Sequence, residues 1–324
     1  MPELWRRYEK GGGLMTTLAE RVRYAQGVIK TAAELSSLYY DKPVVVCYSG
    51  GKDSDVLLDI VRKTLKPSEF RVLNSHTTLD APETVYYIRR KFEELRAEGI
   101  DATVAYPYYK GERTSFYKLI LEKRMLPTRV RRYCCKILKE TATPHQVALL
   151  GVRETESRNR QGRDDFGVRG RRKEDFVYKS VQHTRAMIAY DQDGTHDFEC
   201  EIIKTAKAKK DVLSMPIYKF TESDVWGYIR ENSLEVNPLY SKGYKRVGCI
   251  GCPMAGKGRY KEFAQYPKYR ENLERTCDRL LKLREDRGNP ITKVNTGKEM
   301  IRWWLEEDPK QITLEEYLKG GTDA

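Results

Sequence analysis

One stretch of the sequence decides the fold: Val44-Val45-Val46-Cys47-Tyr48-Ser49-Gly50-Gly51-Lys52-Asp53-Ser54. Its β-branched start predicts a short buried strand over 44–48, the glycines allow a tight turn, and residues 53–66 continue at helical spacing. A glycine turn that opens a helix presents unpaired N–H groups and the positive end of the helix dipole to a phosphate. The stretch is not a Walker A motif, because Asp53 follows Lys52 where that motif has Ser or Thr. It predicts a strand, a phosphate-binding loop and a helix.

The flanking segments continue this alternation of strand and helix. Further strands are predicted at 70–74, 102–106 and 146–152, and helices at 14–40, 82–97 and 114–124. Strands that alternate with helices indicate parallel βαβ units, so we expect an α/β fold with a doubly wound parallel sheet. Residues 153–175 are charged and nearly devoid of apolar side chains and are predicted to form a mobile loop. Residues 176–215 are less regular in pattern.

The C-terminal third is predicted to be mainly helical. Helical spacing returns at 221–231, 260–287 and 298–307. We therefore expect three parts: an N-terminal helical segment over 1–42, a nucleotide-binding α/β core over 43–200, and a mainly helical appendage over 201–324.

Charge and hydropathy narrow the class of protein. The 324 residues include 60 Lys and Arg against 47 Asp and Glu, a net charge of +13, which favours an anionic partner. No apolar run approaches the ~20 residues that a membrane-spanning helix needs. The first residues carry charge without a following apolar stretch, so no secretory signal is predicted and the cytoplasm is the expected compartment.

Four of the seven cysteines form a pattern. Cys134 and Cys135 are adjacent, and Cys249 and Cys252 form a C-x-x-C pair. An odd number of cysteines without a secretory signal favours free thiols or a metal site over a disulfide framework. Two such pairs can supply four thiolate ligands to zinc or to an iron–sulfur cluster. Adjacent cysteines are awkward ligands for a zinc tetrahedron, which favours the cluster.

The glycine loop resembles that of the PP-loop ATP pyrophosphatases. Their signature has the form SGGxDS, and residues 49–54 match every fixed position. The resemblance implies an adenine nucleotide alpha hydrolase-like fold in which the loop binds ATP through Ser49, Gly50, Gly51, Lys52, Asp53 and Ser54. Lys52 would neutralise charge on the phosphates, and Asp53 would hold Mg²⁺; capping the helix is the alternative role for Asp53.

Other segments resemble the phosphoadenosine phosphosulfate reductase-like superfamily. Residues 151–158 match a G-x-R-x-x-(E/Q)-S block, residues 80–84 resemble a shortened D-x-x-x-P-E-T segment, and residues 214–252 resemble the approach to the second cysteine pair. The resemblance implies that Arg153 and Arg158 contact phosphates, that Glu156 orients them, and that Asp80 belongs to the nucleotide site. It also implies a [4Fe–4S] cluster on the ligands Cys134, Cys135, Cys249 and Cys252.

The expected reaction depends on the cysteines. Reductases of this superfamily use a nucleophilic cysteine near the C-terminus, and this sequence has none after Cys277. The resemblance is then to the DndC and SspD type proteins of DNA phosphorothioation, which implies an adenylating sulfurtransferase that acts on nucleic acid, with DNA the expected polymer and a cysteine desulfurase as sulfur donor. The alternatives are an assimilatory phosphoadenylyl or adenylyl sulfate reductase, a tRNA thiolation enzyme and a non-catalytic nucleotide-sensing module.

A basic run surrounds the first cysteine pair. Residues 123–139 contain seven Lys or Arg and no acid, which predicts a positive rim that faces phosphate beside the cluster; a solvated charged face is the alternative. Tyrosines such as Tyr106, Tyr108 and Tyr109 are candidates for stacking on bases. Among the histidines, His76 is a site candidate because it lies near the end of the predicted second strand.

Overall fold

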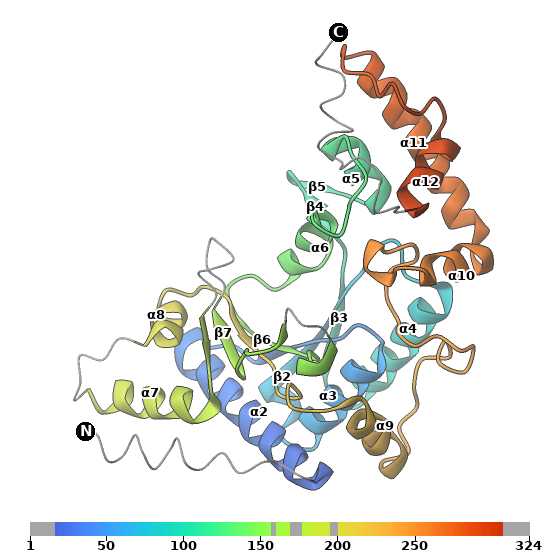
Figure 1. Cartoon of the computed structure of the whole chain (residues 1–324). Coiled ribbons are helices and arrows are strands. Elements are labelled where there is room, and N and C mark those ends of the chain that lie inside the picture. Colours follow the sequence, from blue (N-terminus) through green and yellow to red (C-terminus); the bar gives the residue numbers. More distant parts are fainter. Residues whose placement is uncertain (1–16, 157–159, 169–176, 195–199, 307–324) are drawn as a thin grey trace. The chain divides into compact units, whose positions relative to one another are not determined.

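The chain folds into two compact units whose segments alternate along the sequence. The computed structural model describes residues 17–156, 160–168, 177–194 and 200–306 (Figure 1). Unit 1 comprises residues 1–75, 83–105 and 143–247, and unit 2 comprises residues 76–82, 106–142 and 248–324. The three-part division predicted at residues 42 and 200 stays a prediction.

Unit 1 is built on a seven-stranded sheet in the order β3-β2-β1-β6-β9-β7-β8. The first five strands run parallel, and β7 pairs antiparallel with β9 and β8. The strands are β1 (Val44–Cys47), β2 (Phe70–Ser75), β3 (Asp101–Ala105), β6 (Val147–Leu150), β7 (Phe166–Val168), β8 (Val177–Lys179) and β9 (Val212–Ser214). The predicted doubly wound sheet is confirmed. Chain order reverses at β1, which lies between β2 and β6, and ligands of open α/β sheets bind at such a switch point.

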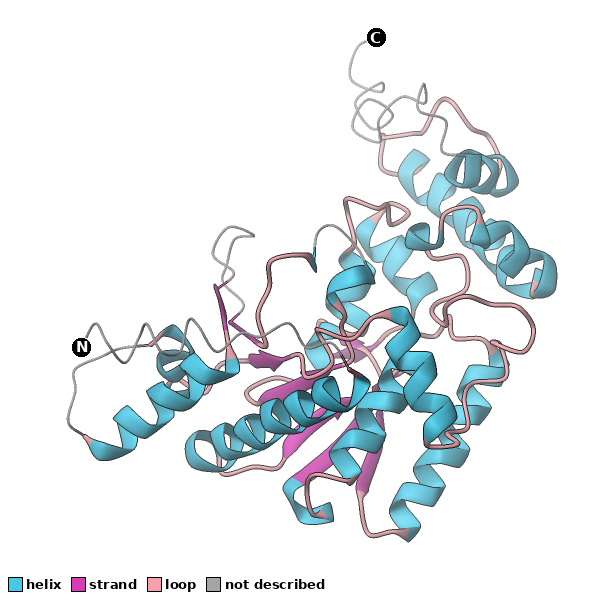
Figure 2. Cartoon of the chain, turned by 60° about the horizontal axis from the view of Figure 1, so that its bottom comes forward, coloured by secondary structure: helices cyan, strands magenta, loops and turns pink. Residues whose placement is uncertain are grey.

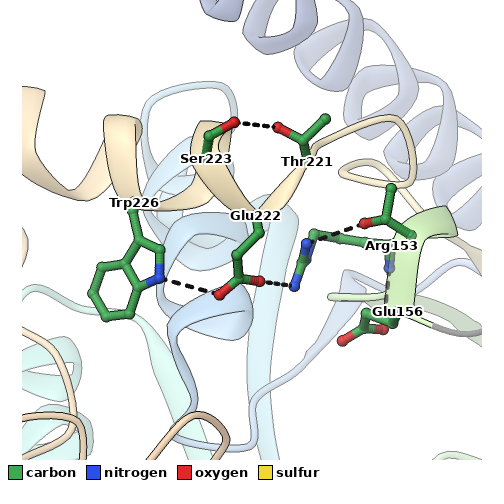
Figure 3. Close-up of a pocket in the computed structure, with 7 residues that line it drawn as sticks. Arg153, Glu156, Thr221, Glu222, Ser223 and Trp226 are labelled. Atoms are coloured by element: carbon green, nitrogen blue, oxygen red, sulfur yellow. Dashed lines mark hydrogen bonds and ion pairs between the residues drawn. The ribbon is translucent and has the colours of Figure 1, made fainter. Parts of the chain in front are cut away.

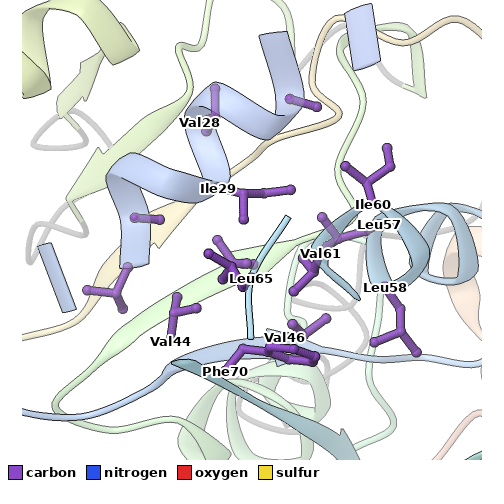
Figure 4. Packing of buried hydrophobic residues seen from close by; sticks show 14 of the residues in the cluster. Val28, Ile29, Val44, Val46, Leu57, Leu58, Ile60, Val61, Leu65 and Phe70 are labelled. Carbon is purple, nitrogen blue, oxygen red and sulfur yellow. The ribbon is translucent and has the colours of Figure 1, made fainter. Parts of the chain in front are cut away.

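Helices lie against the strands of this sheet (Figure 2). They are α2 (Leu18–Tyr40), α3 (Lys52–Arg62), α4 (Pro82–Ala97), α7 (Val181–Asp193), α8 (Glu201–Lys207) and α9 (Glu222–Glu231). Thr17 and Glu20 form a capping box at the start of α2. Val28 and Ile29 of α2 are fully buried, as are Val44 and Val46 of β1 and Ile60 of α3 (Figure 4). This apolar layer fixes the point at which β1 ends and the glycine loop begins.

One prediction for the middle of the chain is wrong. The region 153–175, predicted as a mobile loop, contains β7, a strand of three residues whose charged flanks hide it in the sequence pattern. The region 176–215, whose pattern is less regular, contains β8, α7, α8 and β9. Tertiary packing stabilises elements this short, and local propensity alone does not reveal them.

Unit 2 consists of a small hairpin and helices. The hairpin joins β4 (Tyr108–Tyr109) to β5 (Glu112–Arg113), and the helices are α5 (Phe116–Lys123), α6 (Tyr133–Leu138), α10 (Gly258–Gln265), α11 (Pro267–Glu285) and α12 (Gly297–Glu306). Helix α11 packs against α5 and α12. The single helix predicted over 260–287 is wrong, because Pro267 ends α10 and occupies the first turn of α11. No helix in the described part of the chain is long and apolar enough to cross a membrane.

Candidate active site

The glycine loop follows β1 and is held in shape by its own side chains. Gly50 has a φ of +71°, and a Cβ at this position would lie 2.8 Å from Cγ1 of Ile88. The Ser54 hydroxyl accepts a hydrogen bond from the Gly51 N–H at 3.1 Å and donates one to the Gly51 carbonyl at 2.7 Å. Gly51 is the residue before the first turn of α3. The loop therefore needs glycine for its backbone and Ser54 to close it.

Four charged side chains form a ring beside the loop, here called the charge ring: Lys52, Asp53, Arg153 and Glu222. The Lys52 ammonium lies 3.1 Å from the Asp53 carboxylate and 3.4 Å from that of Glu222. The Arg153 guanidinium lies 2.5 Å from each of the same two carboxylates. Lys52 and Arg153 are only 4% and 3% exposed. A buried cation is stable only when an anion is paired with it. The two carboxylates therefore stabilise Lys52 and Arg153, the same cations that could bind a phosphate.

A pocket of about 690 Å³ opens beside the charge ring (Figure 3). It is lined by Arg153, Thr155, Glu156, Thr221, Glu222, Ser223 and Trp226. The Trp226 indole N–H donates to Glu222 at 3.1 Å, and its ring meets that of Tyr240 edge-on at 5.4 Å. The Tyr240 hydroxyl accepts a hydrogen bond from the backbone N–H of Lys52 at 3.0 Å. The pocket thus joins a cation, hydroxyls and an aromatic ring to the phosphate loop.

Electrostatics keep Glu222 ionised. Burial favours its neutral form, but the charges of Lys52 and Arg153 outweigh burial and hold the pKa of Glu222 below its ordinary value. Because the two carboxylates balance the two cations, the charge ring is close to neutral. An arriving phosphate would compete with Glu222 and Asp53 for the same donors.

A further carboxyl group, that of Asp55, is buried in the first turn of α3. Asp55 is 6% exposed and accepts hydrogen bonds from the hydroxyls of Tyr48 at 2.5 Å and Tyr87 at 3.1 Å. Burial raises the pKa of Asp55 to about 7, although both tyrosine hydroxyls act in the opposite direction. Asp55 was not among the residues predicted from the sequence; the apolar run 56–58 that follows it is the signal that could have marked it.

The structure brings only some of the predicted loop residues together. Lys52, Asp53 and Arg153 meet in the charge ring. The Glu156 carboxylate accepts a hydrogen bond from the Arg153 backbone at 3.4 Å and pairs with Arg160. Arg158 lies outside the described residues. The nucleotide-binding roles of these residues stay predictions.

Asp80 belongs to unit 2, whereas the loop belongs to unit 1. Its carboxylate accepts from the Thr77 N–H at 2.8 Å and lies 3.4 Å from Nδ1 of His76. Burial alone would favour the neutral acid, but hydrogen bonds from His76 and Thr77 and the charge of Lys139 lower the Asp80 pKa. The predicted role of Asp80 in nucleotide binding stays a prediction.

Sequence reasoning did not assign a role to Glu222, Trp226 or Tyr240. All three lie in the segments that carry the family resemblance, but only folding brings α9 and the residues after it to the end of β1. An acid at the first position of a capped helix is the signal that could have marked Glu222.

The cysteine quartet (Cys134, Cys135, Cys249 and Cys252) lies within unit 2. Two of its members begin helix α6, and the other two lie in the turn before α10. The turn is anchored by Cys249, whose thiol donates to the Thr77 hydroxyl at 3.3 Å, and by the Ile250 N–H, which donates to the Leu79 carbonyl at 2.8 Å. Gly251 has a φ of +72°, and a Cβ there would overlap the Phe263 ring.

The thiols of the quartet influence one another. A hydrogen bond between the neighbours lowers the Cys135 pKa and raises that of Cys134, and the charges of Cys249 and Cys252 raise the Cys134 pKa further. Lys139 and Arg132 also favour the Cys135 thiolate. Yet nowhere in the described residues are three or more His, Cys, Asp or Glu side chains arranged to hold a metal ion. The predicted cluster, and zinc as its alternative, stay predictions.

Curated relatives include reductases and proteins of unknown function. An adenosine 5′-phosphosulfate reductase of Neisseria meningitidis is 27% identical over 78% of this chain and 86% of its own length. That of Oceanobacillus iheyensis is 26% identical over 66% and 72%. Two uncharacterized proteins of Methanocaldococcus jannaschii are 27% and 26% identical, and the chain spans less than half of their length, 44% and 41%.

Solved structures resemble the chain more distantly. A phosphoadenylyl-sulfate reductase from Candida auris aligns at a TM-score of 0.38 with 18% identity, over 69% of this chain and 87% of the other. An FMN adenylyltransferase from Candida glabrata in complex with ATP aligns at 0.41 with 12% identity, over 76% and 68%. Alignments with TM-scores this low carry no argument about the reaction that this chain catalyses.

A family model supplies the assignment. The model described as the phosphoadenosine phosphosulfate reductase domain matches residues 43–255. This range contains the glycine loop, the charge ring and the cysteine quartet. Because the match covers more than half of the sequence, the chain belongs to the phosphoadenosine phosphosulfate reductase domain family.

Proposed function

We propose that the protein is a PP-loop ATP pyrophosphatase that adenylates a nucleic-acid phosphate, with DNA the expected polymer, for replacement of oxygen by sulfur. The observation that carries the proposal is the charge ring beside the glycine loop. It holds two buried cations, Lys52 and Arg153, at the N-terminus of a helix. Such a site binds a polyphosphate and stabilises the charge that develops as pyrophosphate leaves.

The reaction has three steps. An oxygen of the acceptor phosphate attacks the α-phosphorus of ATP, the α–β bridging P–O bond breaks, and pyrophosphate leaves with its electron pair. A persulfide sulfur from a cysteine desulfurase then attacks the activated acceptor phosphorus. AMP leaves with the original oxygen, and a thiol cleaves the remaining S–S bond. Lys52 and Arg153 bind the phosphates in the first step, Asp53 would hold Mg²⁺, and the pocket at Trp226 receives the acceptor phosphate.

An iron–sulfur cluster belongs to the same proposal. Its ligands would be the cysteine quartet, and it would supply sulfur or electron-transfer chemistry. Support comes from the donor set: four thiols in one unit, with Lys139 and Arg132 favouring a thiolate. The adjacent pair Cys134 and Cys135 is an awkward ligand set for a zinc tetrahedron, which favours a cluster over zinc.

Reduction of an adenylyl sulfate is the second candidate. It is favoured by the curated relatives named adenosine 5′-phosphosulfate reductase, which match up to 78% of this chain. The same cations would then bind the nucleotide phosphate, and the product would be sulfite.

One pair of assays separates the two candidates. Protein purified without oxygen is incubated with ATP and Mg²⁺, with and without DNA or tRNA, and pyrophosphate is measured. A parallel sample receives adenylyl sulfate and a thiol reductant, and sulfite is measured. Pyrophosphate release that depends on nucleic acid supports the proposal, and the polymer that stimulates release identifies the acceptor. Sulfite without pyrophosphate would overturn the proposal in favour of the reductase. ATP binding without either product would indicate a nucleotide-sensing module.

A further inference from the structure

The β4–β5 hairpin of unit 2 presents a fixed surface outside both sites described above. Tyr109 pairs with Glu112, and the residues between them, Lys110 and Gly111, have φ angles of +54° and +83°. Two consecutive left-handed residues are typical of a type I′ turn, whose twist matches the strands of a hairpin. The Thr114 N–H donates to the Pro107 carbonyl at 2.9 Å and closes the base of the hairpin. The backbone of this hairpin is therefore held in place.

Two tyrosines at the hairpin, Tyr106 and Tyr108, are exposed, and a cation lies over the ring of Tyr106. Tyr108 is 60% exposed and Tyr106 is 43% exposed. The Arg113 guanidinium lies 4.0 Å from the centre of the Tyr106 ring, and His76 meets that ring edge-on at 5.5 Å. Several exposed aromatic side chains gathered on one surface mark a binding site more often than single ones do. The aromatic–basic surface is defined here as Tyr106, Tyr108, Tyr109, Arg113 and Lys123.

The surrounding sequence adds positive charge. Residues 106–139 contain ten Lys or Arg and only two acids, Glu112 and Glu122. Both acids are already paired, Glu112 with Lys118 at 2.6 Å and Glu122 with Lys110 at 3.5 Å. The Lys123 ammonium lies 4.5 Å from the centre of the Tyr109 ring and donates to its hydroxyl at 2.7 Å. Strand β4 also contacts α6, the helix of Cys134 and Cys135.

We propose that the aromatic–basic surface binds single-stranded nucleic acid. Exposed rings stack on bases whose faces are free, and the cations bind the backbone phosphates. A duplex hides its base faces, so it gains only the phosphate contacts. This proposal rests on the proposed function, because it names the surface that binds the acceptor strand. That surface belongs to unit 2, which also carries the cysteine quartet.

Binding of a labelled, mixed-sequence oligodeoxynucleotide to the full chain tests this surface by fluorescence anisotropy at several salt concentrations. Tyr108→Ala and Tyr106→Ala are each expected to raise the Kd about 5-fold or more, since a base–aromatic stack contributes ~1 kcal/mol or more. Tyr108→Phe keeps the ring and should bind like the unchanged protein. Arg113→Ala should reduce the slope of log K against log salt by about 0.7, the value for one phosphate contact on a single strand.

Matched controls come from helix α4 of unit 1. Tyr86 is 68% exposed and Arg89 is exposed, so Tyr86→Ala and Arg89→Ala remove the same chemistry elsewhere and should leave binding unchanged. A single-stranded RNA and a duplex of the same length identify the preferred polymer. Equal affinity of Tyr108→Ala and the unchanged protein would overturn the proposal, as would a duplex that binds as tightly as the single strand.

Pyrophosphate release distinguishes failure of this surface from failure of the proposed function. If DNA stimulates release equally in the unchanged protein and in Tyr108→Ala, the surface is wrong and the proposed function stands. If Tyr108→Ala loses binding but no nucleic acid affects release in the unchanged protein, the surface stands and the proposed function is wrong.

Discussion

The charge ring of unit 1 and the cysteine quartet of unit 2 balance their positive charges in different ways. Both place cations beside buried or half-buried polar groups. In the charge ring, Lys52 and Arg153 are paired with the carboxylates of Asp53 and Glu222. In the quartet, Arg132 and Lys139 favour thiolates, whose charge appears only when a proton is lost or a metal binds. The first site is electrostatically complete without a ligand, whereas the second depends on what its thiols bind.

The largest expected effect is at the charge ring. Lys52→Ala removes one of two buried cations and leaves Asp53 and Glu222 with Arg153 alone. We expect pyrophosphate release from ATP to fall about 100-fold or more, because a preorganised charge at the departing phosphate is lost. Lys66→Ala, at an exposed lysine of unit 1, is the matched control. Release unchanged by Lys52→Ala would refute the role of the loop.

The quartet should respond through its metal content. Cys249→Ser is expected to remove most of the iron and sulfide found after anaerobic purification, because one of four ligands is lost. Cys47→Ala is the control, since Cys47 lies in β1 of unit 1 and burial raises its pKa to about 12. Zinc, or no metal, in the unchanged protein would contradict the proposal that the quartet binds an iron–sulfur cluster.

The third prediction concerns the buried Asp55 carboxyl and the pH dependence of protein stability. Its pKa is raised to about 7 in the folded protein from an ordinary value of 3.8. The folded state therefore binds the proton more tightly, and this contribution to stability is present at low pH and lost as pH rises through 7. The free energy of unfolding should fall by up to about 1.4 kcal/mol per pH unit between about pH 4 and 7.

Asp55→Asn should lack this dependence, because an amide does not titrate. Urea unfolding of both proteins at pH 5 and pH 8 measures the difference. Parallel pH profiles for the two proteins would show that Asp55 is ionised throughout and that the tyrosine hydroxyls outweigh burial.

The smallest expected effect concerns the rigidity of the loop. Gly50→Ala and Gly99→Ala both place a side chain at a positive φ, +71° and +79°. Only the first also meets a neighbour, Ile88 at 2.8 Å, whereas nothing lies within 4 Å of the second. Gly50→Ala should cost about 1–3 kcal/mol more in unfolding free energy than Gly99→Ala. Equal losses of unfolding free energy in the two variants would mean that the loop or Ile88 shifts readily to make room for the added methyl group.

Four of the five parallel strands, β1, β2, β3 and β6, could be predicted because they are short apolar runs between helices with clear boundaries; β9, the fifth, was not. Helix α4, for example, begins at Pro82 and ends at Ala97 as predicted. The hairpin at Lys110-Gly111 was missed because its strands have two residues each. The break before Pro267 was missed because helical spacing continues on both sides of it.

The candidate site was predictable only where its residues are neighbours in sequence. Lys52 and Asp53 follow directly from the loop pattern. Glu222 joins them from the first turn of α9, far along the chain, and no local signal in the sequence states that this helix begins beside the glycine loop. Asp55 was missed for a different reason: an acid on a helix normally faces solvent, and its burial depends on hydroxyls from Tyr48 and Tyr87.

The alternation of the two units along the chain has a consequence for synthesis. Unit 2 takes its segments from residues 76–82, 106–142 and 248–324. More than a hundred residues separate Cys135 from Cys249, which takes about ten seconds at a typical ribosomal rate. During that interval the first cysteine pair is outside the ribosome without the second, and its thiols are open to oxidation. Assembly of the quartet therefore cannot begin before Cys249 and Cys252 have been synthesised.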